Sequence, residues 1–558
     1  MKKSSLVSNF DASKLPVGLS SYIIPVFLGF LSASSTQIVL NNGRFDLWNL
    51  SLVFSFLTFT VLYGVLYRVM EYWGVNKRST PPLLSKRWRS VCDRLNLRFT
   101  LRSVTRAALL LFICWLPYLL VLKPGVYWWD TTYQVVQFLD FDSPLIDHHP
   151  VMDTMLFGSV SKFGYEVTGS YLTGLYALIV IQSILTCCVL AAFCCLLGRF
   201  GVSSSIQAVL LLFFALFPFF PVFNSALSKD SVSLPFFIGF YICFAEIWRR
   251  RAASPKLIFG LILCAAVASM TKKTALLIVL PSILAVIPIL NGWRFRTPLI
   301  FLTIVVWAVV SMAIPKITEA IHGFAPGGRQ EMLAVPLQQA ANIIIKARDE
   351  IEPRELDVLQ DSYLYPLDEL ADRYSWRVVD GVKGGGEAPN ADYTEFIKVW
   401  VGLVVRKPVL AFEAWSGLTA GWFSYGDTLL DPPLTSSNVN EGIKELPGWD
   451  AGGYWNESLS DWYGQLLTIP VLNLLFSRAL WGSFIPGYLV FSSLRAPSGQ
   501  RMRRLVLYAP VLLTVASLMV GPTSLTREAV RYVAPMVFAL PCLMAVQNGL
   551  ARKQHENE

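Results

Sequence analysis

Residues 170–197 read SYLTGLYALIVIQSILTCCVLAAFCCLL and contain no Asp, Glu, Lys or Arg. Because a bilayer core about 30 Å thick is crossed by roughly 20 apolar residues of helix, this stretch is long enough to span a membrane. Eleven more apolar runs lie on either side of it, at about 19–40, 47–70, 104–122, 204–223, 231–248, 256–270, 274–290, 298–315, 478–494, 504–520 and 529–547. The sequence therefore predicts an all-α polytopic membrane protein with about twelve transmembrane helices. The first run follows Met1-Lys2-Lys3 and is longer than a signal peptide requires, so we expect it to be retained.

The overall composition agrees with a membrane protein and excludes other classes. Of the 558 residues, 54% are hydrophobic and 15% are charged, and the mean hydropathy is +0.50. Soluble globular chains carry roughly 25% charged residues, so the composition excludes a soluble enzyme, a disordered protein and a nucleic-acid binder. The nine cysteines lie in apolar runs or in one basic loop, which favours buried thiols over a disulfide framework or a zinc site.

The charged residues alternate between loops in a way that predicts the topology. Lys and Arg gather in five groups, around 68–106, 249–256, 294–296, 495–504 and 552–553. All five groups fall on the same side of a twelve-span protein, and positively charged loops stay in the cytoplasm. We therefore expect a multi-pass protein of the cell membrane with both termini cytoplasmic.

The acidic residues predict where the chain extends outside the membrane. Residues 316–461 carry 12 basic and 23 acidic side chains, whereas the rest of the chain carries 35 and 15. This asymmetry predicts a large outer-face segment at 316–477, between spans nine and ten. An N-terminal transmembrane module at 1–315 would precede it, and C-terminal transmembrane helices at 478–558 would follow.

The large outer loop 123–169 of the N-terminal module carries the first candidate for chemistry. Asp130 directly follows Trp128 and Trp129 at a membrane exit. Tryptophan rings offer flat apolar faces to a sugar, and a carboxylate can accept a hydroxyl proton as a general base. The alternative is that the tryptophans anchor the membrane interface and Asp130 caps a helix. We expect the active site on this outer face.

Cationic side chains at other outer turns are candidates for binding a phosphate. Lys229-Asp230 opens one span, Lys272 lies in the turn after the seventh span, and Arg527 and Arg531 open the last span. The two arginines are four residues apart and would share one helix face, and the planar guanidinium suits a phosphate. The alternatives are a boundary ion pair with an N-cap at Lys229-Asp230, and pairing of the arginines with outer carboxylates.

Two pairs of adjacent polar residues are further candidates. His148 and His149 could hold a metal or shuttle a proton, although adjacent histidines do not share a helix face. Gln338 and Gln339 could hydrogen-bond a sugar, or they could belong to a plain helix surface.

Taken together, these residues resemble the GT-C class of integral-membrane glycosyltransferases, and within it a bacterial family of GT-C-like proteins without an assigned function. The matching pieces are Trp129-Asp130 with Gln134, His149-Pro150 with Thr154, Lys229-Asp230, Glu331 with Pro336-Leu337-Gln338-Gln339, and Arg531-Tyr532 with Pro535. The resemblance covers about 120–540. It implies a GT-C-like fold, a sugar activated on a polyprenyl phosphate and used from the outer leaflet, and an essential acidic residue at Asp130.

We therefore expect a glycosyltransferase that moves a sugar from a polyprenyl-phosphate donor to an extracytoplasmic acceptor, which would be an envelope glycan, a lipid or a protein. Such a transfer needs a base for the acceptor hydroxyl and cations for the departing phosphate. Asp130 is the expected base, with Asp153 or Asp230 as substitutes. Lys229, Arg531 and Lys272 would hold the phosphate, and Gln134 and Tyr532 are further substrate-binding candidates.

The remaining expectations concern cofactors, partners and the rival function. No cofactor is required by the sequence, and a divalent metal such as Mg²⁺ or Mn²⁺ would fit if Asp130 and Asp230 converge. Membrane lipid is an expected partner and nucleic acid is not. The alternative function is a twelve-span secondary transporter or a flippase for lipid-linked sugars, which would usually show internal repeats and polar groups at the bilayer midplane.

Overall fold

The structure, a computed structural model, describes residues 20–76, 92, 94–139, 145–426, 428–436, 439, 441–449, 454–521 and 523–555. Most of these residues are helical, and the strands among them are four segments of two residues each. The expected all-α class is therefore confirmed. The basic residues expected between 77 and 91 lie outside the described part of the chain.

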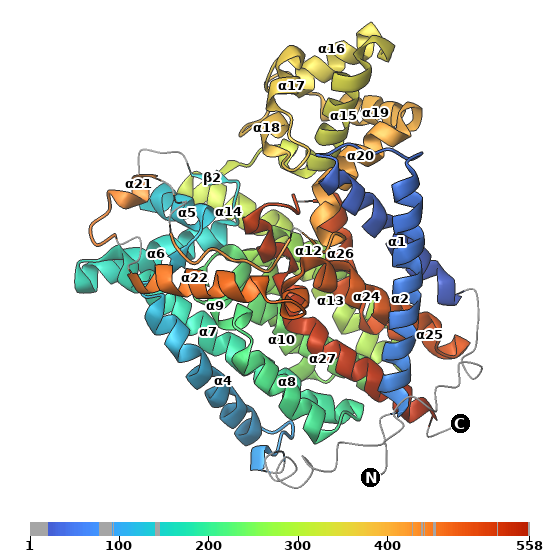
Figure 1. Ribbon diagram of the computed structural model, residues 1–558. Coiled ribbons are helices and arrows are strands. Elements are labelled where there is room, and N and C mark those ends of the chain that lie inside the picture. The colour runs from blue at the N-terminus through green and yellow to red at the C-terminus, as the bar shows by residue number, and fades with distance from the viewer. Residues whose placement is uncertain are drawn as a thin grey trace.

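The helices follow the predicted apolar runs closely (Figure 1). The N-terminal part contains α1 (Ser20–Leu40), α2 (Leu50–Asn76), α4 (Leu101–Val121), α5 (Trp129–Leu139), α6 (Val151–Thr168), α7 (Tyr171–Leu196), α8 (Ser204–Leu216), α9 (Phe219–Asn224), α10 (Lys229–Arg250), α11 (Pro255–Thr271), α12 (Lys273–Val286), α13 (Trp293–Ala308) and α14 (Ile314–His322). The middle part contains α15 (Ala334–Ala347), α16 (Pro353–Ser362), α17 (Leu370–Arg373), α18 (Asp380–Lys383), α19 (Tyr393–Arg406) and α20 (Pro408–Thr419). The last part contains α21 (Glu441–Lys444), α22 (Tyr454–Thr468), α23 (Leu472–Phe476), α24 (Ile485–Leu494), α25 (Ser498–Leu507), α26 (Ala509–Val520) and α27 (Val530–His555).

Several helices are long and apolar enough to cross a membrane. Within the described residues there are seven, at Tyr22–Leu40, Leu50–Gly74, Leu101–Val121, Tyr171–Phe200, Lys229–Arg250, Trp293–His322 and Arg527–Arg552. The pair α25 and α26, bent by 65°, makes an eighth if it is one span. The other four expected runs correspond to shorter apolar helices, at Ser204–Leu216, Pro255–Thr271, Lys273–Ile289 and Leu480–Leu494. The chain is thus a multi-pass membrane protein by helix length and composition, and the count of twelve spans stays a prediction.

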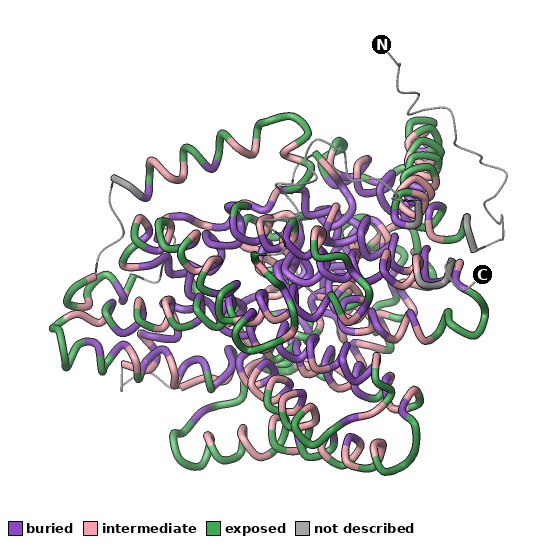
Figure 2. The backbone as a smooth tube through the Cα atoms, turned by 90° about the horizontal axis from the view of Figure 1, so that it is seen from below, coloured by how far each residue is buried: buried purple, intermediate pink, exposed green. Residues whose placement is uncertain are grey.

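Two of the candidate spans form the centre of the helical body. In α10 and α27, 89% and 83% of the apolar window is buried by the rest of the chain, against 17% in α2. An apolar helix that is covered all round belongs to the interior of a bundle, whereas α2 presents an apolar surface outward. Figure 2 shows the buried chain in the middle of the body and the exposed chain around it.

Helices α15 to α20 form a separate module at one end of the body (Figure 1). They share a hydrophobic core of their own, with Leu337, Leu359, Leu370, Phe396 and Leu403 almost fully buried. The chain after this module returns to the main body, because Leu430, Tyr463 and Phe476 pack in its core. The expected outer segment 316–477 therefore has two parts. One is the compact module, and the other is a segment that returns to the main body.

The basic groups meet at the opposite end of the body from this module. Arg199 after α7 pairs with Glu246 of α10 at 2.7 Å, and Arg495 after α24 pairs with Glu71 of α2 at 2.8 Å. Arg552 of α27 donates to the carbonyl of Gly74 at the end of α2. The described members of these basic groups therefore share one end of the molecule, as the alternation of charge predicted.

Two short parallel strand pairs tie loops together near the module end. β1 (Val126–Tyr127) pairs with β3 (Ala226–Leu227), which joins the entry of α5 to the entry of α10. β2 (Ile146–Asp147) pairs with β4 (Ala325–Pro326), which joins the entry of α6 to the chain leading into the module. These pairings fix the starts of helices relative to one another.

Candidate functional site

Five helices begin at one place and present polar side chains there. They are α5, α6, α10, α12 and α27, and the residues at or just before their first turns are Asp130, His149, Asp153, Lys229, Asp230, Lys272 and Arg531. Contacts between these side chains connect the first turns of all five helices. Since a helix N-terminus carries partial positive charge and backbone N–H groups without helical partners, this arrangement favours an anion.

Asp130 is bound by two cations from distant parts of the chain. Its Oδ2 lies 2.9 Å from Lys229 Nζ and 2.5 Å from Arg531 Nη1. Burial raises the pKa of the Asp130 carboxyl, but the positive charges of Lys229 and Arg531 outweigh it and hold the pKa well below its usual range. Asp130 is therefore a carboxylate at neutral pH, with its side chain 16% exposed.

Asp230 forms a second ion pair beside the first. Its Oδ1 lies 2.5 Å from Lys272 Nζ, and its Oδ2 lies 3.8 Å from Arg531 Nε. The guanidinium of Arg531 thus lies between the two carboxylates. We call Asp130, Lys229, Asp230, Lys272 and Arg531 the Asp130 cluster. Its three cations face two carboxylates, which leaves one positive charge in excess.

The two histidines are neutral and adjoin the cluster. Lys229 Nζ lies 3.1 Å from His149 Nδ1, and burial together with the charge of Lys229 lowers the pKa of His149 to about 2. The ring of His148 lies 4.5 Å from that of His149, centroid to centroid, and burial lowers its pKa as well. Neither imidazole adds charge at neutral pH.

Asp153 differs from the other two carboxyl groups because no cation binds it. The side chain is fully buried in the first turn of α6, and neither oxygen has a hydrogen-bond partner among the described residues. Burial raises the pKa of Asp153 well above its usual range, and the charge of Asp230 adds to this against that of Lys229. Burial therefore favours the protonated form of Asp153, whereas the cations at Asp130 favour the ionised form there.

Several buried polar atoms at the cluster form no hydrogen bond within the described residues, although Asp230 Oδ2 and Arg531 Nε face each other as an ion pair at 3.8 Å. Besides Asp153, they are Trp128 Nε1, Gln134 Oε1, Asp230 Oδ2 and Arg531 Nε, each without a hydrogen bond within the described residues. A buried polar group left unpaired costs about 1–3 kcal/mol, so such groups rarely gather by chance in a folded protein. Their concentration marks the cluster as a place built for a polar ligand.

Aromatic rings surround Arg531. Its guanidinium carbon lies 5.0 Å from the ring centre of Tyr532 and 5.8 Å from that of Trp128, within cation–π range. The Tyr532 hydroxyl also accepts a hydrogen bond of 3.1 Å from Arg531 Nη2. Trp128 is buried at 3% exposure whereas Trp129 is 46% exposed, so only the first of the adjacent tryptophans is part of the cluster's wall.

A further set of ion pairs connects the cluster to the module. Lys273 Nζ lies 2.9 Å from Asp147 Oδ1, next to the histidines. Lys383 of α18 lies 2.7 Å from Glu331, whose charge acts on His148. Lys383 carried no signal in the sequence, because only the folded chain brings α18 to the entry of α15.

The structure brings most predicted site residues together, but not all of them. Gln134 lies at the site, where its Nε2 donates to Thr154 at 3.0 Å. Gln338 and Gln339 lie instead in the module, where they donate to the carbonyls of Ser375 and Ala411. Both side chains are buried in α15, so the expected position on a helix surface is wrong. Their amide groups donate to backbone carbonyls, and a sugar-binding role stays a prediction.

Arg527 is also placed away from the cluster. It pairs with Asp431 at 2.9 Å, which is the pairing with an outer carboxylate that the sequence left open. The expectation that Arg527 and Arg531 share a helix face is wrong, because Arg527–Ala529 is a 3₁₀ turn and α27 begins only at Val530. Two side chains four residues apart point in directions that differ by roughly 40° around the axis of an α-helix, but by roughly 120° around the axis of a 3₁₀-helix. Side chains separated by the larger angle do not share a face.

The carboxylates are also candidate ligands of a divalent metal. In the described part of the chain no three His, Cys, Asp or Glu side chains are grouped to hold a metal ion. Asp130 and Asp230 do converge, but on Arg531. In this structure both carboxylates are paired with the chain's own cations, Lys229, Lys272 and Arg531, and a divalent metal at this place stays a prediction.

Residues 140–558 match the model of a family of unknown function, DUF6020. No curated protein and no solved structure shows significant similarity to the chain.

Proposed function

Because the chain belongs to the DUF6020 family of unknown function, its activity has to be inferred from its own residues, and we propose that it is a glycosyltransferase. It moves a sugar from a polyprenyl-phosphate donor to an acceptor outside the cytoplasm, with the Asp130 cluster as the active site. This proposal includes the finer expectations from the sequence, namely a GT-C-like fold with twelve spans, both termini in the cytoplasm and the site on the outer face.

The observation that carries the proposal is the ionised carboxylate of Asp130 held by Lys229 and Arg531. A base and phosphate-binding cations are the two groups that transfer from a phosphate needs, and here they are in direct contact. The excess positive charge and the five helix N-termini supply the electrostatic environment for a departing phosphate.

The proposed reaction uses these groups as follows. The acceptor oxygen forms a bond to the anomeric carbon while the bond from that carbon to the phosphate oxygen breaks. The acceptor proton passes to Asp130, and the leaving phosphate keeps the bonding electrons. Lys229, Lys272 and Arg531 bind the charge that develops on the phosphate.

The ion pairs also supply a way to activate the base. Without donor, Lys229 and Arg531 keep the pKa of Asp130 low, which makes it a poor proton acceptor. A bound phosphate competes for the same two cations, because Arg and Lys bind phosphate as well as carboxylate. Donor binding would then release Asp130 and raise its pKa, so the base becomes stronger only when the donor is present.

The placement of the charges favours transfer over transport. Lys229, Asp230 and Arg531 lie at the starts of α10 and α27 rather than at their centres. A transporter usually places its polar groups near the bilayer midplane on broken helices. Charges gathered at helix starts instead serve a ligand at the membrane surface.

The test is to incubate purified protein with a panel of polyprenyl-phosphate sugars and an acceptor extract, and to measure the release of polyprenyl phosphate. Wild-type protein should release it with at least one sugar. Asp130→Asn should lower the rate by about 10²- to 10⁴-fold, the usual contribution of a general base. Asp368→Asn is the matched control, because Asp368 is an exposed ion-pair partner in the module, and it should leave the rate unchanged.

Two results would contradict the proposal. One is a wild-type protein that releases lipid phosphate with no sugar on the panel. The other is Asp130→Asn protein that keeps near-normal turnover, which would remove the base from the mechanism.

A further inference from the structure

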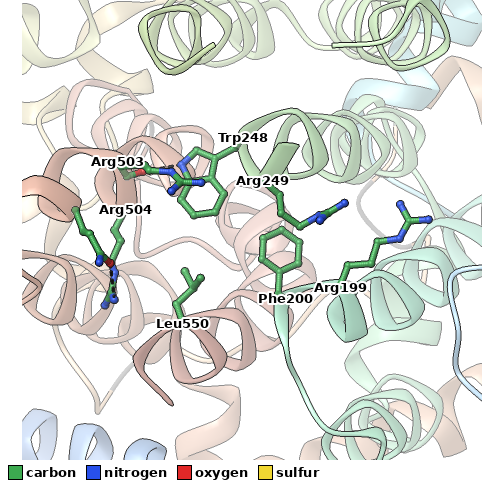
Figure 3. Close-up of a pocket in the computed structure, with 8 residues that line it drawn as sticks. Arg199, Phe200, Trp248, Arg249, Arg503, Arg504 and Leu550 are labelled. Carbon is green, nitrogen blue, oxygen red and sulfur yellow. Dashed lines mark hydrogen bonds between the residues drawn. The ribbon is translucent and has the colours of Figure 1, made fainter. Parts of the chain in front are cut away.

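A second site candidate lies at the end of the molecule opposite the Asp130 cluster. It is a cavity of about 120 Å³ where four elements meet, and Figure 3 shows the side chains that line it. Its lining comes from the 3₁₀ turn Leu197–Phe200 that follows α7, from the end of α10, from α25 and from the end of α27. Three of these elements belong to candidate spans that end here, at Phe200, Arg250 and Arg552. The cavity therefore lies at the level where spans leave the membrane.

The cavity has a cationic rim and an apolar wall. Arg199, Arg249, Arg503 and Arg504 contribute the guanidinium groups. The apolar wall consists of Phe200, Trp248 and Leu550. Figure 3 shows Arg199 and Arg249 on one side of these apolar side chains and Arg503 against the ring of Trp248.

The positive charge at the rim exceeds the negative charge that faces it. Glu246 is shared by Arg199 at 2.7 Å, Arg249 at 2.9 Å and Arg250. A second carboxylate, Glu71, acts on Arg504 and is paired with Arg495 at 2.8 Å. The single carboxylate of Glu246 cannot neutralise three guanidinium groups, so two positive charges remain from this set alone.

Arg503 adds a cation for which the described part of the chain supplies no ion-pair partner. Its buried Nε has no hydrogen-bond partner there either. Its guanidinium carbon lies 4.5 Å from the ring centre of Trp248, whose own indole N–H donates to the carbonyl of Arg503. The stacked ring holds the guanidinium in place with a donor still available, which is an arrangement prepared for an anion.

We propose that this cavity binds the phosphate head group of an anionic phospholipid from the leaflet on the basic side of the protein. Guanidinium groups bind phosphate oxygens in pairs, and the excess charge here matches a phosphodiester. The apolar wall would pack against the glycerol and the first methylenes of the acyl chains. Basic pockets between spans on the cytoplasmic side are suited to anionic lipids. The site is separate from the Asp130 cluster and does not depend on its function.

The test uses native mass spectrometry of the full-length protein in detergent. Phosphatidylglycerol and phosphatidylcholine are added in separate samples, and the fraction of protein that retains lipid is measured. We expect wild-type protein to retain phosphatidylglycerol in preference. The double variant Arg249→Gln/Arg503→Gln should bind it about tenfold less tightly or weaker, since each charge-assisted contact is worth roughly that factor.

The matched control is Arg102→Gln/Arg106→Gln. These arginines are exposed on α4, at the same basic end but outside the cavity, and their removal should leave lipid retention unchanged. Melting temperatures without lipid show whether each variant folds, and Arg503→Gln alone replaces the double variant if the latter does not.

A parallel titration with inorganic phosphate separates a lipid from a soluble phosphate ester. Weak competition by phosphate, with strong retention of phosphatidylglycerol, supports the lipid. Displacement of the lipid by millimolar phosphate would overturn the lipid assignment in favour of a soluble ligand. Equal retention of both lipids, or equal loss in the cavity and control variants, would overturn the site itself.

Discussion

At the scale of single residues, the environments of Asp130 and Asp153 shift the pKa of the same side-chain type in opposite directions. Cations bind Asp130 and hold its pKa low. The ionised carboxylate therefore stabilises the folded protein at pH values above its unfolded pKa of about 4. This stabilisation is lost as the pH falls through the pKa of the folded state. Burial without a cation raises the pKa of Asp153. Its cost to folding therefore grows as the pH rises from about 4 toward the folded pKa.

This contrast predicts opposite effects for the two asparagine substitutions. Asp153→Asn removes a buried group that the unfolded state ionises, so the variant should melt a few degrees higher than wild type at pH 8, with a smaller difference at pH 5. Asp130→Asn removes a paired carboxylate and should melt lower than wild type at both pH values. Melting curves in detergent at pH 5 and pH 8 measure this. An Asp153→Asn difference that is the same at both pH values would show that Asp153 is ionised in the folded protein.

At the scale of the elements, the first turns of α10 and α27 position the cations. Ser228 caps α10 in a capping box with Ser231, which fixes the direction of Lys229 and Asp230. The 3₁₀ turn before α27 sends Arg527 to Asp431 and leaves Arg531 between Asp130 and Asp230. Arg527 and Arg531 are thus only four residues apart, but Arg527 pairs with Asp431 and Arg531 belongs to the Asp130 cluster.

This separation makes Arg527 a natural control for Arg531. Arg531→Lys keeps the charge but loses the fork that reaches Asp130 through Nη1 and Asp230 through Nε. A lysine ammonium is a point charge and cannot occupy both positions, so affinity for polyprenyl phosphate should fall by roughly tenfold. Arg527→Lys should leave the affinity unchanged. Binding of a fluorescent polyprenyl phosphate to each purified variant measures the effect, and equal affinities would remove Arg531 from donor binding.

Local sequence was sufficient to locate most of the helices and to select charged residues that the fold brings together. Asp130 and Lys229 could be chosen because charges stand out at the ends of apolar runs. Their contact could not be predicted, because Asp130 is separated from Arg531 by 401 positions and the contact depends on how five helix starts pack. Gln338 was misjudged for the same reason, since only the fold shows that α15 is buried within a module.

At the scale of the whole molecule, charge divides the protein into two ends. Figure 1 shows helices α15 to α20 at one end of the body and the end of α2 at the other. The Asp130 cluster is connected to the module through Lys383 and Glu331, and the basic groups and the arginine-lined cavity lie at the opposite end. Helices α10 and α27 run through the centre of the body and connect the two ends of the molecule. Lys229 and Arg531 lie at the end with the Asp130 cluster, and Arg250 and Arg552 lie at the basic end. A membrane across these helices would separate the two ends.

The positive-inside rule gives this division a direction that can be measured. Lys256 is exposed at the basic end and Asp380 is exposed on the module, so Lys256→Cys should face the cytoplasm and Asp380→Cys the outside. In intact cells, a membrane-impermeant maleimide should label Asp380→Cys and spare Lys256→Cys, and both should be labelled once the membrane is permeabilised. The unsubstituted protein gives the background of its nine native cysteines. Labelling of Lys256→Cys in intact cells would show that the orientation is the opposite of the expected one. The Asp130 cluster would then lie on the cytoplasmic side, where an extracytoplasmic acceptor could not reach it.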